Sequence, residues 1–444
     1  MSICDAFFVL HLSEEKNHSV MARIIQEVQA GWEAIVSFAD KEGAFTLMLG
    51  QASVFGCPLR ANVKYSFCNR GIPIFTTTGC RIEVVSGDVR VGIHDSAIEE
   101  IHMLLEQDRK DSLAADRGGP RVLIVGEVDT GKSSLARTLC NLAVASNALN
   151  SRRVGGKTER AADGQDEEDV APERTAISFV DLDIGQQSLS CPGTICTAFI
   201  DEPLAVDDNF NSVMPLVFFL GEPNPSYPGV FDRYLDCMAH TRRCIDSLQS
   251  TDFEHRRGGT IINTMGWVKG LGLEIIRRAI EVFQVTHVIV TGANIELFDT
   301  MRQVTMDDPR GVSVLHYRSP VSMFKRNQGV RRAARDSLME NYFYGSGRVQ
   351  LVPSRVTVKL QDVAVLNAVT LEPLMTLIPF TLCAVSLAAS EDEVSSANVA
   401  GFVILTDIGH QALGLLSPSP GPLPGRFLLA SNTISAPESL LPPL

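Results

Sequence analysis

Between Gly126 and Ser133 the chain reads GEVDTGKS. This octapeptide fits the Walker A pattern, in which glycines let backbone N–H groups turn inward around phosphate oxygens at the start of a helix. An apolar strand, Val122 to Val125, precedes it, and the segment from Ser133 to Ala145 places leucines on one helical face. A chance match in a loop would lack this strand–loop–helix setting. The stretch therefore predicts a P-loop core that binds ATP.

The residue types in and after this loop predict a phosphate and magnesium site. Lys132 is placed to contact the β- and γ-phosphates, and the Ser133 hydroxyl to ligate Mg²⁺. The next expected strand ends at Asp181 and Asp183. A carboxylate at the carboxyl end of a parallel strand faces the nucleotide crevice, so Asp183 is a candidate to hold the magnesium's water shell or to accept a proton from a hydroxyl. Asp181 lies deeper in the sheet, and a cap or turn role for Asp183 stays open.

The rest of the chain predicts three domains. Strands and helices alternate around the loop, with strands at 177–183, 260–263 and 287–291 and a helix at 271–284. This alternation predicts an α/β core with a parallel sheet and helices on both faces. Short Gly-punctuated strands upstream predict a small β-sandwich, and strands return after Gly345. The expected organisation is an N-terminal extension at 1–31 with a candidate helix at 20–30, an N-terminal β domain at 32–110 with a helix at 98–107, a P-loop domain at 111–345, and a small C-terminal β-rich domain at 346–444. A polar linker is expected at 108–120, and a mobile insertion at 151–174.

Composition narrows the function classes. A net charge of −13 over 444 residues excludes a broad basic face for nucleic acid, so any such contact must be local. The ten cysteines include no C-x-x-C pair, which favours free thiols in a reducing compartment. The N-terminus does not resemble a signal peptide. The longest apolar tract, 363–389, contains prolines and β-branched residues typical of buried strands, not of a membrane span.

Two further features are candidates for substrate contact. Trp267 follows the third expected strand of the core, where it can stack on a base or simply pack. The segment 311–335 carries six basic residues and, before Asp336, no acidic one, in an otherwise acidic chain. Arginines there can neutralise a transferring phosphoryl group, although a solvated basic face is the alternative. GTPases, a rival P-loop class, need an Asn-Lys-x-Asp motif that this chain lacks.

Four motifs together resemble one known family. They read DTGKSS at 129–134, LDIGQQS at 182–188, CPGT at 191–194 and NTMGWVKG at 263–270. The set is similar to that of the Clp-type polyribonucleotide 5′-hydroxyl kinases, which are also subunits of the pre-mRNA 3′-end cleavage and polyadenylation machinery. In this resemblance 263–270 is the clasp segment, and Arg326, Arg331 and Arg332 look like lid arginines.

The resemblance, joined to the loop itself, implies a set of site residues. The catalytic residues would be Lys132, Asp183, Arg326 and Arg331; the metal ligands Ser133 and Asp183; the substrate-binding residues Gln186, Thr264 and Trp267; and the ATP-binding residues Glu33, Arg70, Gly126, Glu127, Val128, Asp129, Thr130, Gly131, Lys132, Ser133 and Ser134. Glu33 and Arg70 rest on the resemblance alone.

Two functions are therefore expected to compete. The first is ATP- and Mg²⁺-dependent phosphorylation of RNA 5′-hydroxyl ends. The second is an ATP-binding scaffold of the mRNA cleavage factor that lacks kinase activity. The expected partners are RNA 5′ ends, subunits of the cleavage and polyadenylation factor and, as a further candidate, the tRNA splicing endonuclease, with no membrane partner. The resemblance implies a nuclear location.

Overall fold

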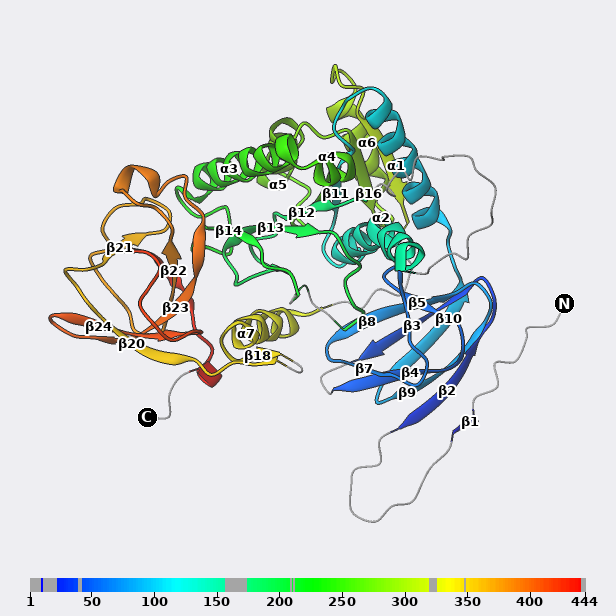
Figure 1. Cartoon of the computed structure of the whole chain (residues 1–444), viewed down its shortest axis with the longest axis horizontal. Helices are drawn as coiled ribbons and strands as arrows, with labels where there is room; N and C mark the ends of the chain where they lie inside the picture. The colour runs from blue at the N-terminus through cyan, green and yellow to red at the C-terminus, as the bar shows by residue number, and fades with distance from the viewer. Residues whose placement is uncertain are drawn as a thin grey trace, which may run out of the picture.

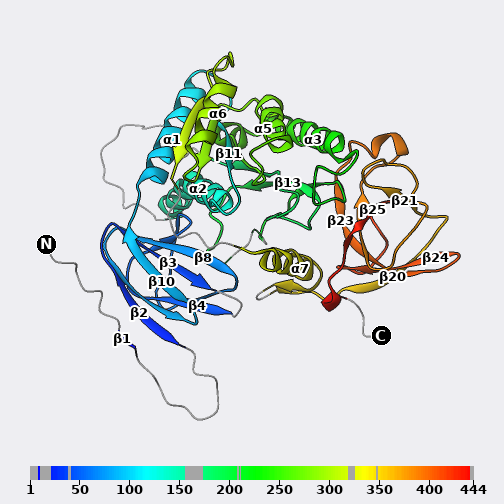
Figure 2. The same ribbon diagram turned by 180° about the vertical axis from the view of Figure 1, so that it is seen from behind.

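The structure is a computed structural model that describes residues 9–10, 22–38, 42–155, 174–207, 210, 212–318, 326–346 and 349–440. Figure 1 shows a β-sandwich (blue), a central α/β body and a β-rich body (orange), with helix α7 lying beneath the central body between the other two. The reverse view keeps the same arrangement (Figure 2). Among the helices in the described ranges, none is long and apolar enough to cross a membrane.

The N-terminal sandwich consists of two five-stranded sheets packed face to face. Alternating apolar residues from both sheets fill the interior, including Phe38, Phe45 and Ile82. The first sheet contains, in order, β1 (Val9–Leu10), β2 (Arg23–Val28), β9 (Cys80–Val85), β4 (Gly43–Gly50) and β7 (Lys64–Phe67). The second contains β10 (Asp88–Ile93), β3 (Trp32–Phe38), β8 (Arg70–Thr76), β5 (Ser53–Val54) and β6 (Cys57–Pro58).

Strand β2 corrects the expected helix at 20–30. Its residues alternate between exposed and half-buried positions as far as Val28, which is a strand period. The strand pairs antiparallel with β9, Arg23 opposite Val85 and Val28 opposite Cys80. The sandwich therefore reaches into the segment that the sequence assigned to an N-terminal extension.

The central body is a seven-stranded mixed sheet. Its order is β14 (Leu216–Phe219), β13 (Thr194–Ile200), β12 (Ile177–Asp181), β15 (Thr260–Asn263), β11 (Arg121–Gly126), β16 (His287–Thr291) and β17 (Ser313–Tyr317). The five strands from β12 to β17 are parallel, as the β–α alternation predicts. Strands β13 and β14 are antiparallel additions that the sequence analysis did not identify.

Helices cover both faces of this sheet, which confirms the expected layers. One face packs against α3 (Val230–Thr251), α5 (Leu271–Val282) and α6 (Ile295–Thr305). The other packs against α1 (Ala97–Ala114) and α2 (Lys132–Gly155), while α4 (Phe253–Gly258) leads into β15. Helix α1 outlasts its expected end at Gln107 because Arg109, in the expected linker, is buried and donates its Nε–H to the carbonyl of Gly258 (3.1 Å).

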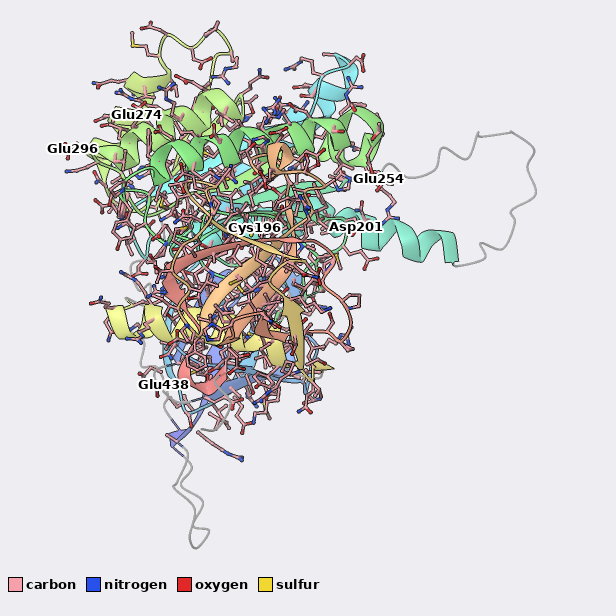
Figure 3. The ribbon with its side chains drawn as sticks, turned by 90° about the vertical axis from the view of Figure 1, so that its left-hand side faces the viewer. Cys196, Asp201, Glu254, Glu274, Glu296 and Glu438 are labelled. Carbon is pink, nitrogen blue, oxygen red and sulfur yellow. The ribbon has the colours of Figure 1, made fainter. Side chains whose placement is uncertain are left out.

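Helix α2 also continues past its expected end, to Gly155. The expected mobile insertion at 151–174 therefore begins inside a helix, and residues 156–173 of it lie outside the described residues. On its far side Arg174 pairs with Asp201 (4.0 Å) and Glu254 (3.8 Å). Figure 3 shows those two carboxylates on the same side of the molecule, with Cys196 in its interior.

The C-terminal body is a six-stranded sheet that packs on the edge of the central one. Its order is β20 (Ser354–Lys359), β24 (Ala412–Ser417), β23 (Val399–Ile408), β22 (Thr381–Ser386), β25 (Phe427–Ser435) and β21 (Ala364–Asn367). Phe219 of β14 meets Phe402 of β23 edge to face, with ring centroids 5.6 Å apart. Helix α7 (Gln328–Tyr344) joins this contact, because the Tyr342 hydroxyl accepts a hydrogen bond from the Phe402 amide (2.9 Å). A short hairpin, β18 (Gly345–Ser346) and β19 (Val349–Gln350), follows α7, and one-turn 3₁₀ helices lie at Glu391–Glu393 and Glu438–Leu440.

Helix α2 fixes the sandwich to the central body. Asn141 is fully buried, and its Nδ2 donates to the carbonyl of Phe55 (2.8 Å) in the sandwich. Its Oδ1 accepts from the Leu204 amide (2.9 Å). One amide side chain thus satisfies backbone groups from two segments and sets the distance between the β8–β5 sheet and the Walker A helix.

We predict that Asn141→Ala lowers the free energy of unfolding by about 2 kcal/mol, because each backbone group left buried and unpaired costs about 1–3 kcal/mol. Urea denaturation of the variant and the wild type measures the difference. Thr300→Ala is the control, since its hydroxyl bonds only a carbonyl of its own helix at the surface and surface changes usually stay within about 0.5 kcal/mol. Equal stability of the Asn141 variant and the wild type would contradict the prediction.

Candidate functional site

The Walker A loop connects β11 to α2 at the carboxyl edge of the sheet. Asp129 and Gly131 have positive φ angles, 60° and 82°, which turn the loop back on itself. The Lys132 ammonium lies inside it and donates to the carbonyls of Gly126 (2.9 Å) and Glu127 (2.8 Å). Desolvation lowers the pKa of Lys132 to about 8, although the negative charge of Asp183 opposes that shift.

Neighbouring strands hold the loop from both sides. The Thr130 hydroxyl is 2.7 Å from that of Thr291, at the end of β16. On the other side Gly266 of the clasp segment packs so closely that a Cβ atom there would lie 2.4 Å from a methyl group of Val128. The Asn294 amide, which follows β16, donates to Glu127 Oε1 (2.9 Å). The loop therefore has a fixed shape before any ligand enters.

Asp181 and Asp183 occupy different depths beside the loop. Asp181 is fully buried and accepts hydrogen bonds from the Ser188 amide (3.0 Å) and hydroxyl and from Asn263 Nδ2 (3.0 Å). Desolvation and the charge of Asp183 raise the pKa of Asp181 to about 6. Asp183 is only half-buried, so it is the carboxylate nearer to the crevice, as the sequence predicts.

Asp183 has its own network. Its Oδ1 accepts from the amides of Gly185 (3.2 Å) and Gln186 (2.9 Å), which orient the carboxylate. Desolvation raises the pKa of Asp183, and the neighbouring Lys132 charge limits the rise. The Gln186 side chain donates to the carbonyl of Gly185 (2.7 Å). The Asp183 carboxylate is therefore held in one orientation and lies close enough to Lys132 for the two charges to interact.

Asn263, at the end of β15, is a site residue that the sequence analysis did not single out. Its Nδ2 also donates to Ser133 Oγ (3.3 Å), which links the Walker A serine to Asp181. Its Oδ1 is buried and has no hydrogen-bond partner among the described residues. Ser133, Asp183 and this amide oxygen form an oxygen-only donor set, which is the kind that Mg²⁺ prefers. The residues present thus fit the metal that the P-loop implies.

A cavity of about 210 Å³ lies between the sandwich and the Walker A helix. Its walls come from both bodies, and they include Glu33, Phe75, His94, Gly131 and Ser134. Aromatic and apolar groups surround a few polar ones, a lining typical of a site for a planar ring. Glu33 thus lines a cavity beside the loop, and its contact with ATP stays a prediction.

Arg70 does not line this cavity. It begins β8, and desolvation followed by the positive charge of Arg326 lowers the pKa of its guanidinium. Arg70 therefore lies near Arg326 and not beside Glu33, whose partner on β8 is Phe75. Its contact with ATP stays a prediction.

His94 is the cavity residue for which the sequence gave no signal. Its Nδ1 lies 3.2 Å from Glu33 and its Nε2 3.1 Å from Glu99, and the ring lies on Phe75 with centroids 3.9 Å apart. Burial disfavours its charged form, but the hydrogen bonds to the two carboxylates outweigh burial and raise the pKa of His94 to about 9. A lone histidine after a strand carries no motif, so only the fold identifies it.

Two of the lid arginines reach the loop from the start of helix α7: Arg331 lies in its first turn, and Arg326 lies just before its N-cap residue, Asn327. Arg326 Nε is 3.1 Å from Asp129 Oδ1, and Arg331 Nη2 is 2.8 Å from Asp129 Oδ2. Arg331, Arg332 and Arg335 lie on α7, whereas Lys325 lies outside the described residues. Arg326 and Arg331 are therefore gathered at the Walker A loop, but Arg332, the third expected lid arginine, is 79 % exposed and lies 3.9 Å from Asp336.

The clasp residues have unequal roles. Trp267 is 39 % exposed at the same edge of the sheet, which favours a stacking surface over simple packing. Thr264 differs from its expected role, because it is buried and its hydroxyl donates to the carbonyl of Ile124 (2.8 Å). This hydrogen bond ties the clasp to β11, so the Thr264 side chain does not face a substrate.

Comparisons with known proteins bear on this arrangement. Residues 169–345 match a family profile described as the P-loop of mRNA cleavage and polyadenylation factor CLP1. Residues 27–112 match the N-terminal beta-sandwich domain of polyadenylation factor, and residues 352–434 match pre-mRNA cleavage complex II protein Clp1.

Curated relatives cover most of the chain. The polyribonucleotide 5′-hydroxyl-kinase Clp1 of Gallus gallus is 31 % identical over 86 % of this chain and 89 % of its own length. That of Homo sapiens is 30 % identical over 88 % and 91 %. Among solved structures, a wild-type Clp1p–Pcf11p complex matches with a TM-score of 0.76 at 20 % identity, covering 92 % of this chain and 97 % of its counterpart.

We predict a pH-dependent contribution of His94 to stability. Its folded-state pKa of about 9 lies above its ordinary value of 6.5. The pairs with Glu33 and Glu99 therefore stabilise the fold fully below pH 6.5, and that stabilisation is lost as the pH rises through about 9. Urea denaturation of the wild type and of His94→Gln measures it, because the difference between the two should be large near about pH 6 and small near about pH 10.

His410→Gln is the matched control, since His410 is exposed and should give no pH-dependent difference from the wild type. A His94→Gln difference that is constant across the same pH range would contradict the ion-pair assignment.

Proposed function

Because the chain belongs to the Clp1 family of mRNA cleavage and polyadenylation factors, we propose that it transfers the γ-phosphoryl group of ATP to the 5′-hydroxyl end of RNA. The observation that carries the proposal is the convergence of four charged groups on one loop. The Lys132 ammonium, the Asp183 carboxylate and two lid arginines come from separate elements and all lie at the Walker A turn. Arginines placed at this loop suit stabilisation of the charge on a transferring phosphoryl group.

Nucleotide binding is divided between two bodies. The inward-turned loop and the start of α2 offer backbone N–H groups to the phosphates. The cavity beside Gly131 and Ser134 takes the base, with Phe75 as an aromatic wall and Glu33 as a hydrogen-bond acceptor for an exocyclic amino group. Adenine carries such a group at N6, but guanine also has an exocyclic amino group, so this contact alone does not select the base. The choice of ATP rests on the P-loop kinase family to which the chain belongs.

Ser133, Asp183 and Asn263 would hold magnesium, which supplies charge neutralisation for the phosphates when bound. Asp181 lies behind this set and orients it through Asn263. Asp181 is therefore a positioning residue, and the four hydrogen bonds that its carboxylate accepts explain why a carboxylate is tolerated at full burial.

The acceptor is a neutral alcohol, which is a poor nucleophile. As the 5′-oxygen bonds to the γ-phosphorus, the bond from that phosphorus to the bridging oxygen of ADP breaks, and the hydroxyl proton passes to the Asp183 carboxylate. Lys132, Arg326 and Arg331 stabilise the charge on the transferring group. Positioning and charge neutralisation supply most of the rate.

The RNA end enters past the clasp. Trp267 offers an exposed ring at the carboxyl edge of the sheet, on the same side as Asp183. Every base has a π-face, so stacking there holds the terminal nucleotide with little sequence preference. Gln186, next to Asp183, is a further contact for the terminal sugar.

A scaffold role in the mRNA cleavage factor is the second proposal. The solved complex of Clp1p with Pcf11p supports it, because that protein shares the three-body fold of this chain. Cleavage-factor subunits are then partners, the tRNA splicing endonuclease is a further candidate partner, and the location is nuclear. The kinase and scaffold roles are compatible with each other.

We predict that Trp267→Ala weakens RNA binding by about 1–3 kcal/mol and leaves ATP affinity nearly unchanged. Fluorescence anisotropy with a labelled 5′-hydroxyl oligonucleotide and calorimetry with ATP measure the two affinities. The control is Phe253→Ala, because Phe253 is also an exposed aromatic residue but precedes the amino end of β15, whereas Trp267 follows its carboxyl end. If Trp267→Ala leaves the RNA affinity per folded molecule unchanged, Trp267 is a packing residue and does not stack on RNA.

We predict that Arg331→Leu slows phosphoryl transfer by about 10³-fold or more, whereas ATP affinity changes by less than about tenfold. The arginine matters more to the transition state than to bound ATP, because Lys132 and the backbone amides already neutralise much of the triphosphate. The measurement pairs a kinase assay with a nucleotide titration on one preparation. Arg278→Leu, which removes a surface arginine from α5, should change neither quantity.

Parallel losses of transfer and ATP affinity in Arg331→Leu would mean that the arginine only binds nucleotide. Tight ATP binding without transfer by the wild type would favour the scaffold.

A further inference from the structure

Asp129 presents an electrostatic problem. Its carboxylate belongs to a loop that must bind a triphosphate, and like charges repel. Its backbone has a φ of 60°, in the left-handed region that few residues other than glycine adopt without strain. Its side chain is only 10 % exposed, so solvent does not screen the charge well. A glycine at this position would remove both the strain and the repulsion. The acid therefore needs a specific reason.

The contacts of Asp129 supply that reason. Oδ2 accepts from the backbone N–H of Arg326 (3.0 Å) and from Arg331 Nη2 (2.8 Å), and Oδ1 accepts from Arg326 Nε (3.1 Å). Desolvation favours the protonated form of Asp129, but these hydrogen bonds outweigh desolvation and hold the pKa of Asp129 below its usual value. One carboxylate thus meets one backbone and two guanidinium donors, all from the segment that opens helix α7.

The arginines are not saturated by this contact. Arg331 Nε is buried without a hydrogen-bond partner among the described residues. Within the same described part of the chain, Asp129 uses only Nε of the Arg326 guanidinium. One negative charge also leaves a surplus positive charge on the pair. Both guanidinium groups are therefore fixed at one side and have donors to spare, which is the state that a transferring phosphoryl group requires.

The other charges around Arg326 do not replace Asp129. Asp183 lies close enough for the Arg326 charge to affect its pKa, but the described residues include no ion pair between the two. Arg70, on the other side, repels Arg326. Asp129 is the acid that fixes the direction of the side chain.

We propose that Asp129 is a positioning residue that draws Arg326 and Arg331 onto the Walker A loop and so sets them for phosphoryl transfer. The proposal rests on the kinase activity proposed above, and it predicts opposite effects of Asp129 on ATP affinity and on the rate of transfer. The carboxylate weakens ATP binding through charge repulsion, and it increases the rate because it positions the two arginines. A residue that only supported the fold of the loop would affect binding and rate in the same direction.

Asp129→Asn tests the claim, because asparagine has the same shape and also tolerates a positive φ. The variant loses the charge that aligns two guanidinium groups. We expect kcat to fall about 10–100-fold, the size of a lost hydrogen bond to a charged group. ATP affinity, measured by calorimetry on the full chain, should stay the same or increase. Asp308→Asn is the control, because it breaks an Asp–Arg pair of the same kind outside the site and should change neither quantity.

Limited trypsin cleavage gives a readout that does not depend on activity. In the nucleotide-free wild type, Asp129 holds Arg326 and the start of α7, so cleavage between Arg326 and Asn327 should be slow. In Asp129→Asn this cleavage, followed by mass spectrometry, should be several-fold faster at equal global stability.

An unchanged kcat together with an unchanged cleavage rate would overturn the proposal. So would parallel falls in kcat and ATP affinity, because they would make Asp129 a structural part of the loop. If the wild type transfers no phosphate, the proposed kinase activity is wrong, and the positioning role of Asp129 is then tested by trypsin cleavage and ATP affinity alone. Faster cleavage after Arg326 in Asp129→Asn, with undiminished ATP affinity, supports that role. An unchanged cleavage rate overturns it.

Discussion

The arrangement of this protein depends on one constraint: the loop between β11 and α2 must present its N–H groups inward. The turn needs positive φ angles at Asp129 and Gly131, and it puts Lys132 inside the loop. Everything near it serves to hold that shape. Thr291 holds one side through Thr130, and Gly266 of the clasp packs against Val128 on the other. The sandwich is held to the helix of the loop through Asn141, and Arg326 and Arg331 reach the loop from the segment that opens α7. The C-terminal body packs on β14, at the edge of the central sheet.

Electrostatics explains why the site combines so many charges at low exposure. Desolvation destabilises every isolated charge in such a place, so lysine loses protons more easily and carboxylates bind them more tightly. The pKa values of about 8 for Lys132 and about 6 for Asp181 reflect this cost. Pairing reduces it, as with Asp129 and the lid arginines. A bound magnesium triphosphate would enter a site where opposing charges are already fixed, and this preorganisation is the main source of rate in phosphoryl transfer.

Sequence alone predicted the parts of the fold that local pattern determines. β15 and β16 match their expected bounds because each is a short apolar run that stops abruptly at a polar or glycine-rich turn. β2 was mistaken for a helix because its polar and apolar residues do not alternate regularly, although its positions alternate in exposure. β13 and β14 were missed because an antiparallel extension leaves no β–α alternation.

The site residues fall into the same two groups: those that a local sequence pattern predicts and those that only the fold brings together. The Walker A loop and Asp183 are local motifs, so sequence could place them. His94 and Asn263 belong to no local pattern and become visible only when separate strands meet. The contact of Asp129 with Arg326 joins residues that are far apart in the chain, and neither spacing nor composition encodes it. The resemblance gave Glu33 and Arg70 as nucleotide contacts; Glu33 lines the cavity, Arg70 lies near Arg326, and both contacts stay predictions.

The account is tested most directly by the fate of the γ-phosphoryl group. Purified wild-type protein is incubated with magnesium, γ-labelled ATP and either a 5′-hydroxyl RNA oligonucleotide or the same oligonucleotide already bearing a 5′-phosphate. The account predicts label at the 5′ end of the hydroxyl substrate alone, with one ADP formed for each labelled end. ATP binding with no label on either RNA, or release of free phosphate at the same rate with both, would contradict it.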